Sequence, residues 1–234
     1  LLDGFYFPNA VRDHDGNWYG AVVIGDQVWL AENLRTTHYA DGTEIPAGGN
    51  NNSATEPYYY DYSASGIPLE ERGYLYNWPA VMNEEDSSSA NPSGVQGIAP
   101  TGWHVPSDAE WMQLTDYVGR QERYRLGGYD TYIAKALAST EHWNTGTGDH
   151  TPGNDPGRNN ATGFGAVPAG NWYGGFGSAG SYAYFWSSTE YGTSYAWYRG
   201  LGYGYAGVFR GYRYRSNGFS VRCVSDLSPV QFRD

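Results

Sequence analysis

Residues that do chemistry in enzymes are few and scattered in this chain of 234 residues. There is one cysteine, Cys223, and the five histidines stand far apart, at positions 14, 38, 104, 142 and 150. No Ser/His/Asp arrangement and no pair of carboxylates stands out as a catalytic set. Cys223 lies in an alternating apolar segment, where a buried, unreactive thiol is the usual case. We therefore expect no catalytic residues, and a single thiol excludes a disulfide framework and a multi-cysteine zinc site.

Two loops carry oxygen atoms that suit calcium. Residues 13–17 (DHDGN) match the start of a calcium loop, but the acidic residue near the twelfth position and the flanking helices are missing. An Asp-Gly turn is the favoured interpretation. Residues 154–160 (NDPGRNN) offer a second set of oxygen ligands, with a solvated turn again favoured. We expect no metal site and no cofactor, and keep structural calcium in the second loop as the alternative.

The carboxyl-terminal part of the chain has an unusual surface composition. Between residues 171 and 222 the only acidic residue is Glu190, against five arginines. Over 196–213 the sequence alternates with period two, placing Arg199 and Leu201 on one side of a strand and tyrosine and glycine on the other. Glycine weakens strand interiors, so a face that mixes glycine with large aromatics is typical of a ligand surface. Arg199 and Arg210 are interpreted as scaffold, held by inward partners such as Glu190.

Tyrosine would supply rigid contact area on this face, and glycine would supply room. Arg213 and Arg215 would offer bidentate contacts to carboxylate or phosphate groups. The aromatic anchors would be Tyr195, Trp197, Tyr198, Tyr205, Phe209, Tyr212 and Tyr214. The full set of expected ligand-binding residues is Gly192, Thr193, Ser194, Tyr195, Trp197, Tyr198, Gly200, Gly202, Gly204, Tyr205, Gly207, Phe209, Gly211, Tyr212, Arg213 and Tyr214.

Several elements must position this segment. Residues 18–24 and 27–30 predict a hairpin around Gly25-Asp26. Ser107 and Glu110 form a capping box that predicts a helix ending near Gly119. A second helix is expected around 132–138 and a terminal strand at 219–224. Residues 47–100 and 144–163 have mostly loop composition.

Six blocks of the sequence occur in an order that resembles a known family. They are residues 15–17 (DGN), 24–36 (IGDQVWLAENLRT), 102–111 (GWHVPSDAEW), 162–170 (TGFGAVPAG), 184–190 (YFWSSTE) and 218–224 (GFSVRCV). They are similar to the Fibrobacter succinogenes major paralogous domain. The resemblance implies a C-type-lectin-like fold of the formylglycine-generating-enzyme branch: an α+β fold with mixed or antiparallel β structure, two helices and long irregular loops. It also implies a bacterial surface or secreted protein, of a kind found in gut Bacteroidetes and their phages.

The expected organisation follows from this resemblance. Residues 1–226 would form a single domain, with a lead-in at 1–10, a loop-rich insertion at 47–100 and a ligand-face segment at 171–224. Residues 227–234 would be a tail. The localisation implied is extracellular, on the bacterial cell surface or on a virion.

Some members of this fold class are diversified by retroelements that randomise template adenines. The resulting codons cannot encode tryptophan, so Trp197 is excluded as a variable position. They can encode the other fifteen residues of the expected ligand-binding set. The alternative is an ordinary surface hairpin rich in tyrosine and glycine.

Charge and composition narrow the classes of partner. The net charge is −11 and the isoelectric point about 4.8, which disfavours nucleic acid and anionic membranes as partners. No run of 18 apolar residues predicts a membrane span.

The function expected is non-catalytic binding of a protein or glycan on a cell or host surface, through a hypervariable face. The first alternative is an adhesin, pilus-tip or carbohydrate-binding module with a fixed face. Calcium-dependent sugar binding is not expected, since Glu56-Pro57-Tyr58 lacks the third residue of the usual motif. The remote alternative is a formylglycine-generating-like enzyme, which would need cysteine thiolates. The oligomeric state stays open.

Overall fold

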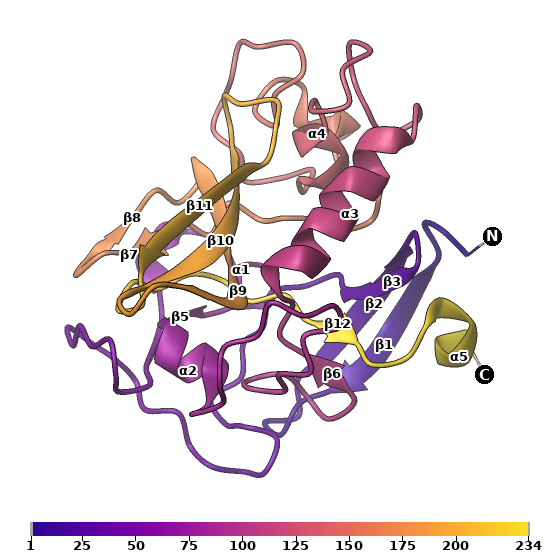
Figure 1. The fold of residues 1–234 in the computed structure, drawn as a ribbon. Coiled ribbons are helices and arrows are strands. Elements are labelled where there is room, and N and C mark those ends of the chain that lie inside the picture. Colours follow the sequence, from indigo (N-terminus) through magenta and orange to yellow (C-terminus); the bar gives the residue numbers. More distant parts are fainter. Residues whose placement is uncertain (1, 234) are drawn as a thin grey trace.

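Strands outweigh helices in the fold, which a computed structural model describes for residues 2–233 (Figure 1). Strands account for 27% of the residues and helices for 16%. Within the described residues there are five α-helices, and every pairing between named strands is antiparallel. The expected α+β class, with a C-type-lectin-like architecture of two helices, is therefore wrong: the chain is mostly antiparallel β structure.

The larger sheet has five strands and grows from the predicted hairpin. Ile24 pairs with Gln27 across a two-residue turn, and Gly25 takes the left-handed φ of 62° that this turn needs. Val23 faces one core cluster, whereas Val22 and Trp29 face another. The sheet is thus buried on both sides, which explains why the hairpin is apolar throughout. The strand order is β1 (Tyr6–Arg12), β2 (Trp18–Ile24), β3 (Gln27–Leu30), β12 (Val224–Ser225), β6 (Trp103–His104).

The longest helix, α3 (Asp108–Arg120), contacts both main sheets. Both hydrogen bonds of its capping box form: Ser107 Oγ accepts from the Glu110 amide, and Glu110 accepts from the Ser107 amide. The helix packs against β2 of the larger sheet and against β9 and β10 of the smaller one (Figure 1). Trp111 lies 4.6 Å from Trp29, ring centre to ring centre. The helix prediction is confirmed, and α3 joins the two sheets through one aromatic core.

The smaller sheet carries most of the expected ligand face. It consists of β9 (Tyr182–Tyr191), β10 (Tyr195–Gly202) and β11 (Phe209–Tyr214), with β10 in the centre. Arg199 pairs with Arg210 and Gly200 with Phe209. The register therefore agrees with the alternation seen in the sequence.

The other regular elements are short. The predicted second helix is only one turn, because Ala138 returns to extended backbone and bridges Ala166. None of the helices within residues 2–233 has the length and apolar character needed to cross a bilayer. The short elements are β4 (Tyr59–Tyr60), β5 (Leu75–Tyr76), β7 (Asn171–Trp172), β8 (Phe176–Gly177), α1 (Leu69–Arg72), α2 (Trp78–Met82), α4 (Ala134–Leu137), α5 (Pro229–Arg233) and 3₁₀ turns at Ser63–Ser65 and Pro156–Arg158.

The predicted strand at 219–224 is mostly not a strand. Phe219 bridges Tyr76 and Ser220 bridges Phe185, so the segment makes single contacts with two neighbours before the short strand β12 begins at Val224. Cys223 is fully buried in the core, and burial raises the pKa of its thiol. The apolar alternation was thus a signal of burial and not of a continuous ladder.

Candidate functional site

The expected ligand-binding residues do not form one patch, because they lie on both faces of the smaller sheet. One face carries Trp197 and Tyr212, together with the arginines Arg199 and Arg210. The opposite face carries Tyr198 and Phe209. The loops 192–194 and 204–207 lie at opposite ends of β10, roughly 24 Å apart for eight residues in a strand. The set therefore divides into separate regions.

Five aromatic side chains form a partly exposed region, here called the tip cluster. It consists of Tyr191, Tyr195, Trp197, Tyr212 and Tyr214. Tyr191 stacks on Tyr212 with ring centres 4.1 Å apart, and Trp197 meets both rings edge to face. Tyr191, Tyr212 and Tyr214 are 44%, 42% and 55% exposed. The rings hold one another in place while presenting apolar area to solvent, which fits a rigid contact surface.

The opposite face is filled by the protein's own rings. A Cβ on Gly200 would lie 2.8 Å from the Phe209 ring, and one on Gly202 would lie 3.0 Å from Tyr182. Tyr198 is buried at 7% exposure against Phe219. The glycines were expected to leave room for a ligand, but aromatic side chains of this chain occupy that room.

The remaining members of the expected set differ in exposure. Gly211 is half-buried beneath Tyr198, and Gly207 is buried beneath Tyr205. Tyr205 itself is 50% exposed. Four loop members are exposed: Gly192, Thr193, Ser194 and Gly204.

A charged anchor ties the tip cluster to α3. Asp108, the first residue of α3, accepts from Arg199 at 2.5 Å and from Arg210 at 2.8 Å. Burial alone would raise the pKa of Asp108, but the hydrogen bonds and charges of Arg210 and Arg199 outweigh it and lower the pKa. Arg210 also stacks on Trp197, 3.6 Å from the ring centre. Asp108 therefore fixes the two arginines, and through Arg210 it fixes the tip cluster.

The sequence had assigned Glu190 as the inward partner of these arginines, and that assignment is wrong. Glu190 pairs instead with Arg215 at 2.6 Å, across the end of the smaller sheet. Arg215 also donates to the Gly192 carbonyl and stacks on Trp78. Arg215 is thus occupied by its own chain, whereas Arg213 is exposed and has no carboxylate partner within residues 2–233.

A lysine ammonium occupies the loop considered for calcium. Lys135 is the chain's one lysine, and its Nζ donates to the carbonyls of Thr151, Asn154 and Asp155. Burial lowers the pKa of Lys135. A calcium ion at these carbonyl oxygens would have to displace the lysine.

The oxygens of the 13–17 loop are likewise engaged in hydrogen bonds. Asp13 accepts from the amide of Asn17 and from the Tyr19 hydroxyl. Asp15 accepts from Thr37 and contacts His38 Nδ1 at 2.5 Å. The loop is therefore a turn that hydrogen bonds hold against residues 36–38.

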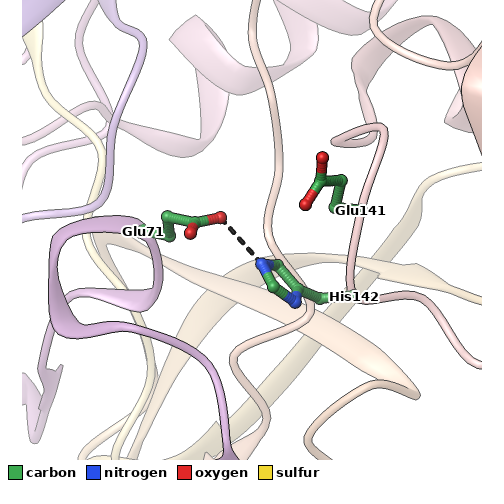
Figure 2. A group of neighbouring side chains, drawn as sticks. All are labelled: Glu71, Glu141 and His142. Atoms are coloured by element: carbon green, nitrogen blue, oxygen red, sulfur yellow. Dashed lines mark hydrogen bonds and ion pairs between the residues drawn. The ribbon is translucent and has the colours of Figure 1, made fainter.

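Three side chains that the sequence did not connect form a candidate metal group. Figure 2 shows Glu71 approaching from α1, while Glu141 and His142 come from a facing loop. Their ligand atoms lie within 4.8 Å of one another, and imidazole with carboxylates suits zinc or another transition ion. Both glutamates are exposed, and His142 Nε2 already contacts Glu71 at 2.7 Å. The contact by itself accounts for the arrangement, as a tie between α1 and the loop. The spacing of 70 residues between Glu71 and Glu141 left no signal in the sequence.

Comparison with known proteins identifies the family. The family model described as the Fibrobacter succinogenes major domain matches residues 22–225. This chain belongs to that family. The match begins within β2 and ends in β12, so the domain includes α3, the smaller sheet and the Asp108 anchor. Searches of curated proteins and of solved structures gave no match.

One of the blocks that resembled the family places a buried histidine beside α3. His104 Nε2 contacts Glu110 and Nδ1 contacts Asp226, both at 2.7 Å. Burial alone would lower the pKa of His104, but the hydrogen bonds and charges of Glu110 and Asp226 raise it above 6.5. The imidazolium thus links the capping box of α3 to the segment after β12.

We expect this link to make stability depend on pH. Below about pH 6.5 His104 is protonated in both states, and its contribution to the free energy of unfolding is present in full. The contribution is lost as pH rises through the higher pKa of the folded state. His104→Gln should therefore cost about 1.5–3 kcal/mol near pH 6 and progressively less toward pH 9. Urea unfolding at several pH values tests this, and a cost that grows with pH would contradict it.

Proposed function

We propose that this domain is a non-catalytic binding protein whose contact surface is centred on the tip cluster. The observation that carries the proposal is the set of five interlocked rings, three of them more than 40% exposed. Exposed aromatics in contact with one another are costly for a monomer unless a partner uses them. Because the rings are already ordered, binding would lose little side-chain entropy.

The chemistry of this region suits a protein or a glycan. Tyrosine rings stack on sugars and on apolar side chains, and their hydroxyls can donate and accept hydrogen bonds. Arg213 is exposed on the opposite face of the sheet, over the Tyr198 ring, where it would add a carboxylate or phosphate contact outside the tip cluster. The burial of Cys223 supports a function without catalysis. An extracellular or cell-surface location would suit this function.

Diversification by a retroelement is part of the proposal in a narrower form than the sequence suggested. Variation is compatible with exposed positions such as Thr193, Tyr212, Arg213 and Tyr214, but not with Gly200, where a side chain would collide with Phe209. A reverse-transcriptase gene and a near-repeat differing only at template adenines should accompany the gene. If the locus holds neither, the face is fixed, and the alternative of an adhesin with a constant surface is favoured.

Binding should be lost when the exposed rings are removed. We expect Tyr212→Ala/Tyr214→Ala to weaken binding to the ligand that the wild type selects from a glycan and protein array by at least about 30-fold, since such central aromatics carry 2 kcal/mol or more. The matched control is Tyr129→Ala, which removes a ring that is 59% exposed on the loop after α3. Equal binding by the double variant and the wild type would remove the tip cluster as the contact surface.

A further inference from the structure

A second candidate site lies outside the tip cluster, at a cavity rimmed by acidic side chains. The cavity has a volume of about 350 Å³, and it lies between α2 and the loops around residues 43–57 and 83–85. Its rim carries four exposed carboxylates, those of Glu44, Glu56, Glu84 and Glu85. Its inner wall is made by buried side chains, Tyr39, Trp78 and Met82. We call this the acidic cavity.

The charge on the rim is not neutralised by the protein itself. Among the ion pairs of residues 2–233, none includes a glutamate of this rim. Glu85 accepts one hydrogen bond, from the Gly97 amide. Carboxylates gathered around a hollow with low-dielectric walls concentrate negative potential there. The cavity should therefore attract a cation.

The tyrosine in the inner wall gives independent evidence for a missing partner. Tyr39 is 3% exposed, and its hydroxyl is buried without a hydrogen-bond partner among the described residues. Buried hydroxyls almost always have partners, because leaving one unpaired costs free energy. Burial and the charge of Glu84 both raise the pKa of Tyr39, so its oxygen stays a neutral acceptor. Tyr39 lines the cavity, so a donor that enters and displaces the atoms covering this hydroxyl would give it a hydrogen-bond partner.

The geometry favours an organic cation over a metal ion. Within residues 2–233, the one group of three ligands close enough to share a metal is Glu71, Glu141 and His142, so the rim carboxylates do not converge on a point. Trp78 and Met82 provide apolar walls that suit methylene groups and offer nothing to a hard cation such as calcium. An alkylammonium group suits this arrangement of carboxylates around an apolar wall. Its alkyl chain would contact the wall, and its three N–H donors would bind the carboxylates.

We propose that the acidic cavity binds a primary alkylammonium group, with Tyr39 and the rim glutamates as its acceptors. The same chemistry is offered by a lysine side chain of a partner protein and by a free diamine. Trp78 also stacks on Arg215, which pairs with Glu190 at the end of β9, so the cavity adjoins the strand that carries Tyr191. The proposal stands apart from the proposed function, since it involves none of the tip residues.

The test is a titration with small ammonium probes, followed by calorimetry and by NMR shifts of backbone amides. Nα-acetyl-lysine methylamide represents the side-chain source, and cadaverine represents the free diamine. We expect saturable binding of at least one probe, with shifts concentrated at residues 39, 44 and 82–85. Binding of the lysine probe assigns the site to a partner's side chain, and binding of cadaverine alone assigns it to a free diamine. Absence of saturable binding, or tighter binding of calcium than of both probes, would overturn the proposal.

Three variants separate a specific site from a general effect of charge. Glu44→Gln/Glu84→Gln should weaken binding at least about tenfold, while the control Glu70→Gln/Glu122→Gln changes the net charge equally and should leave binding unchanged. Tyr39→Phe should weaken binding about two- to tenfold without lowering the thermal midpoint, since the lost hydroxyl has no partner in the unliganded protein. Equal weakening by both double variants would mean that only net charge acts. Tip-cluster variants should bind the probes normally, so the two proposals can fail separately.

Discussion

Replacing Asp108 by asparagine should lower the free energy of unfolding by about 3–5 kcal/mol. Asparagine keeps the size of the side chain, but it removes the negative charge that two guanidinium groups share. Arg199 is 2% exposed, so its charge would remain buried without compensation. Removing one partner of a buried pair costs far more than the pair contributes, because the remaining charge cannot return to water. Urea unfolding at neutral pH measures this loss.

The control for this prediction lies on the same helix. Asp116 faces Arg120 at 3.9 Å in an exposed pair, and Asp116→Asn should cost no more than about 0.5 kcal/mol. A second variant, Asp108→Leu/Arg199→Met, should recover much of the stability, because no buried charge of that pair is left. An Asp108→Asn variant as stable as the Asp116→Asn variant would mean that the two arginines find other partners.

The same substitution should also affect the tip cluster. Arg210 is held by Asp108 on one side and lies over Trp197 on the other, so it transmits the position of α3 to the exposed rings. Without the carboxylate, hydrogen exchange of the β10 and β11 amides should become faster than in the Asp116→Asn control. The anchor therefore positions the tip cluster.

Local features were predictable from the sequence because their causes are local. The capping box needs only Ser107 and Glu110, three residues apart, and the hairpin needs only Gly25-Asp26 between two apolar runs. The alternation of Arg199 with glycine and tyrosine likewise follows from strand geometry alone. Each of these predictions is confirmed in the structure.

Features that depend on distant partners were missed. Asp108 was recognised as favourable at the start of a helix, but nothing in its neighbourhood indicates Arg199, 91 residues away. Nothing in the sequence around Lys135 indicated its carbonyl partners, and nothing around Tyr39 indicated that it lines a cavity. Tyr191 was not among the expected binding residues, although it stacks on Tyr212. Tertiary packing decides all of these contacts.

The glycine-rich face shows how a correct pattern led to a wrong interpretation. Gly200 and Gly202 lie on the predicted side of β10, so the alternation was right. A glycine in a strand signals a close approach by some other group, and the sequence cannot say which group that is. Here the group is an aromatic ring from a neighbouring strand, Phe209 or Tyr182. The expected fold class came from the family resemblance and was wrong, because most of the regular structure is antiparallel β-sheet.

Arg222 should show the second large effect on stability. Its guanidinium is fully buried and donates to Asn33 Oδ1 and to the carbonyls of Leu30, Phe164 and Gly165, with no carboxylate partner among the described residues. These bonds join the end of β3 to the 164–165 turn and to the segment that leads into β12. We expect Arg222→Met, which keeps most of the volume, to lower the free energy of unfolding by about 3–5 kcal/mol, since several buried acceptors lose their donor at about 1–3 kcal/mol each.

An opposing effect makes this prediction informative. Complete burial disfavours the charged form of Arg222 and lowers its pKa, so removing the cation also removes a desolvation cost. Arg222→Lys separates the two effects, because it keeps the charge but loses the planar fork that reaches four acceptors at once, and it too should be destabilised. Exposed Arg158 provides the control, with Arg158→Met expected within about 0.5 kcal/mol of the wild type. Arg222→Met could instead be as stable as the wild type while Arg222→Lys is not. In that case the desolvation of the buried charge costs as much free energy as its hydrogen bonds contribute. Arg222 would then specify the arrangement of the three segments without stabilising the fold.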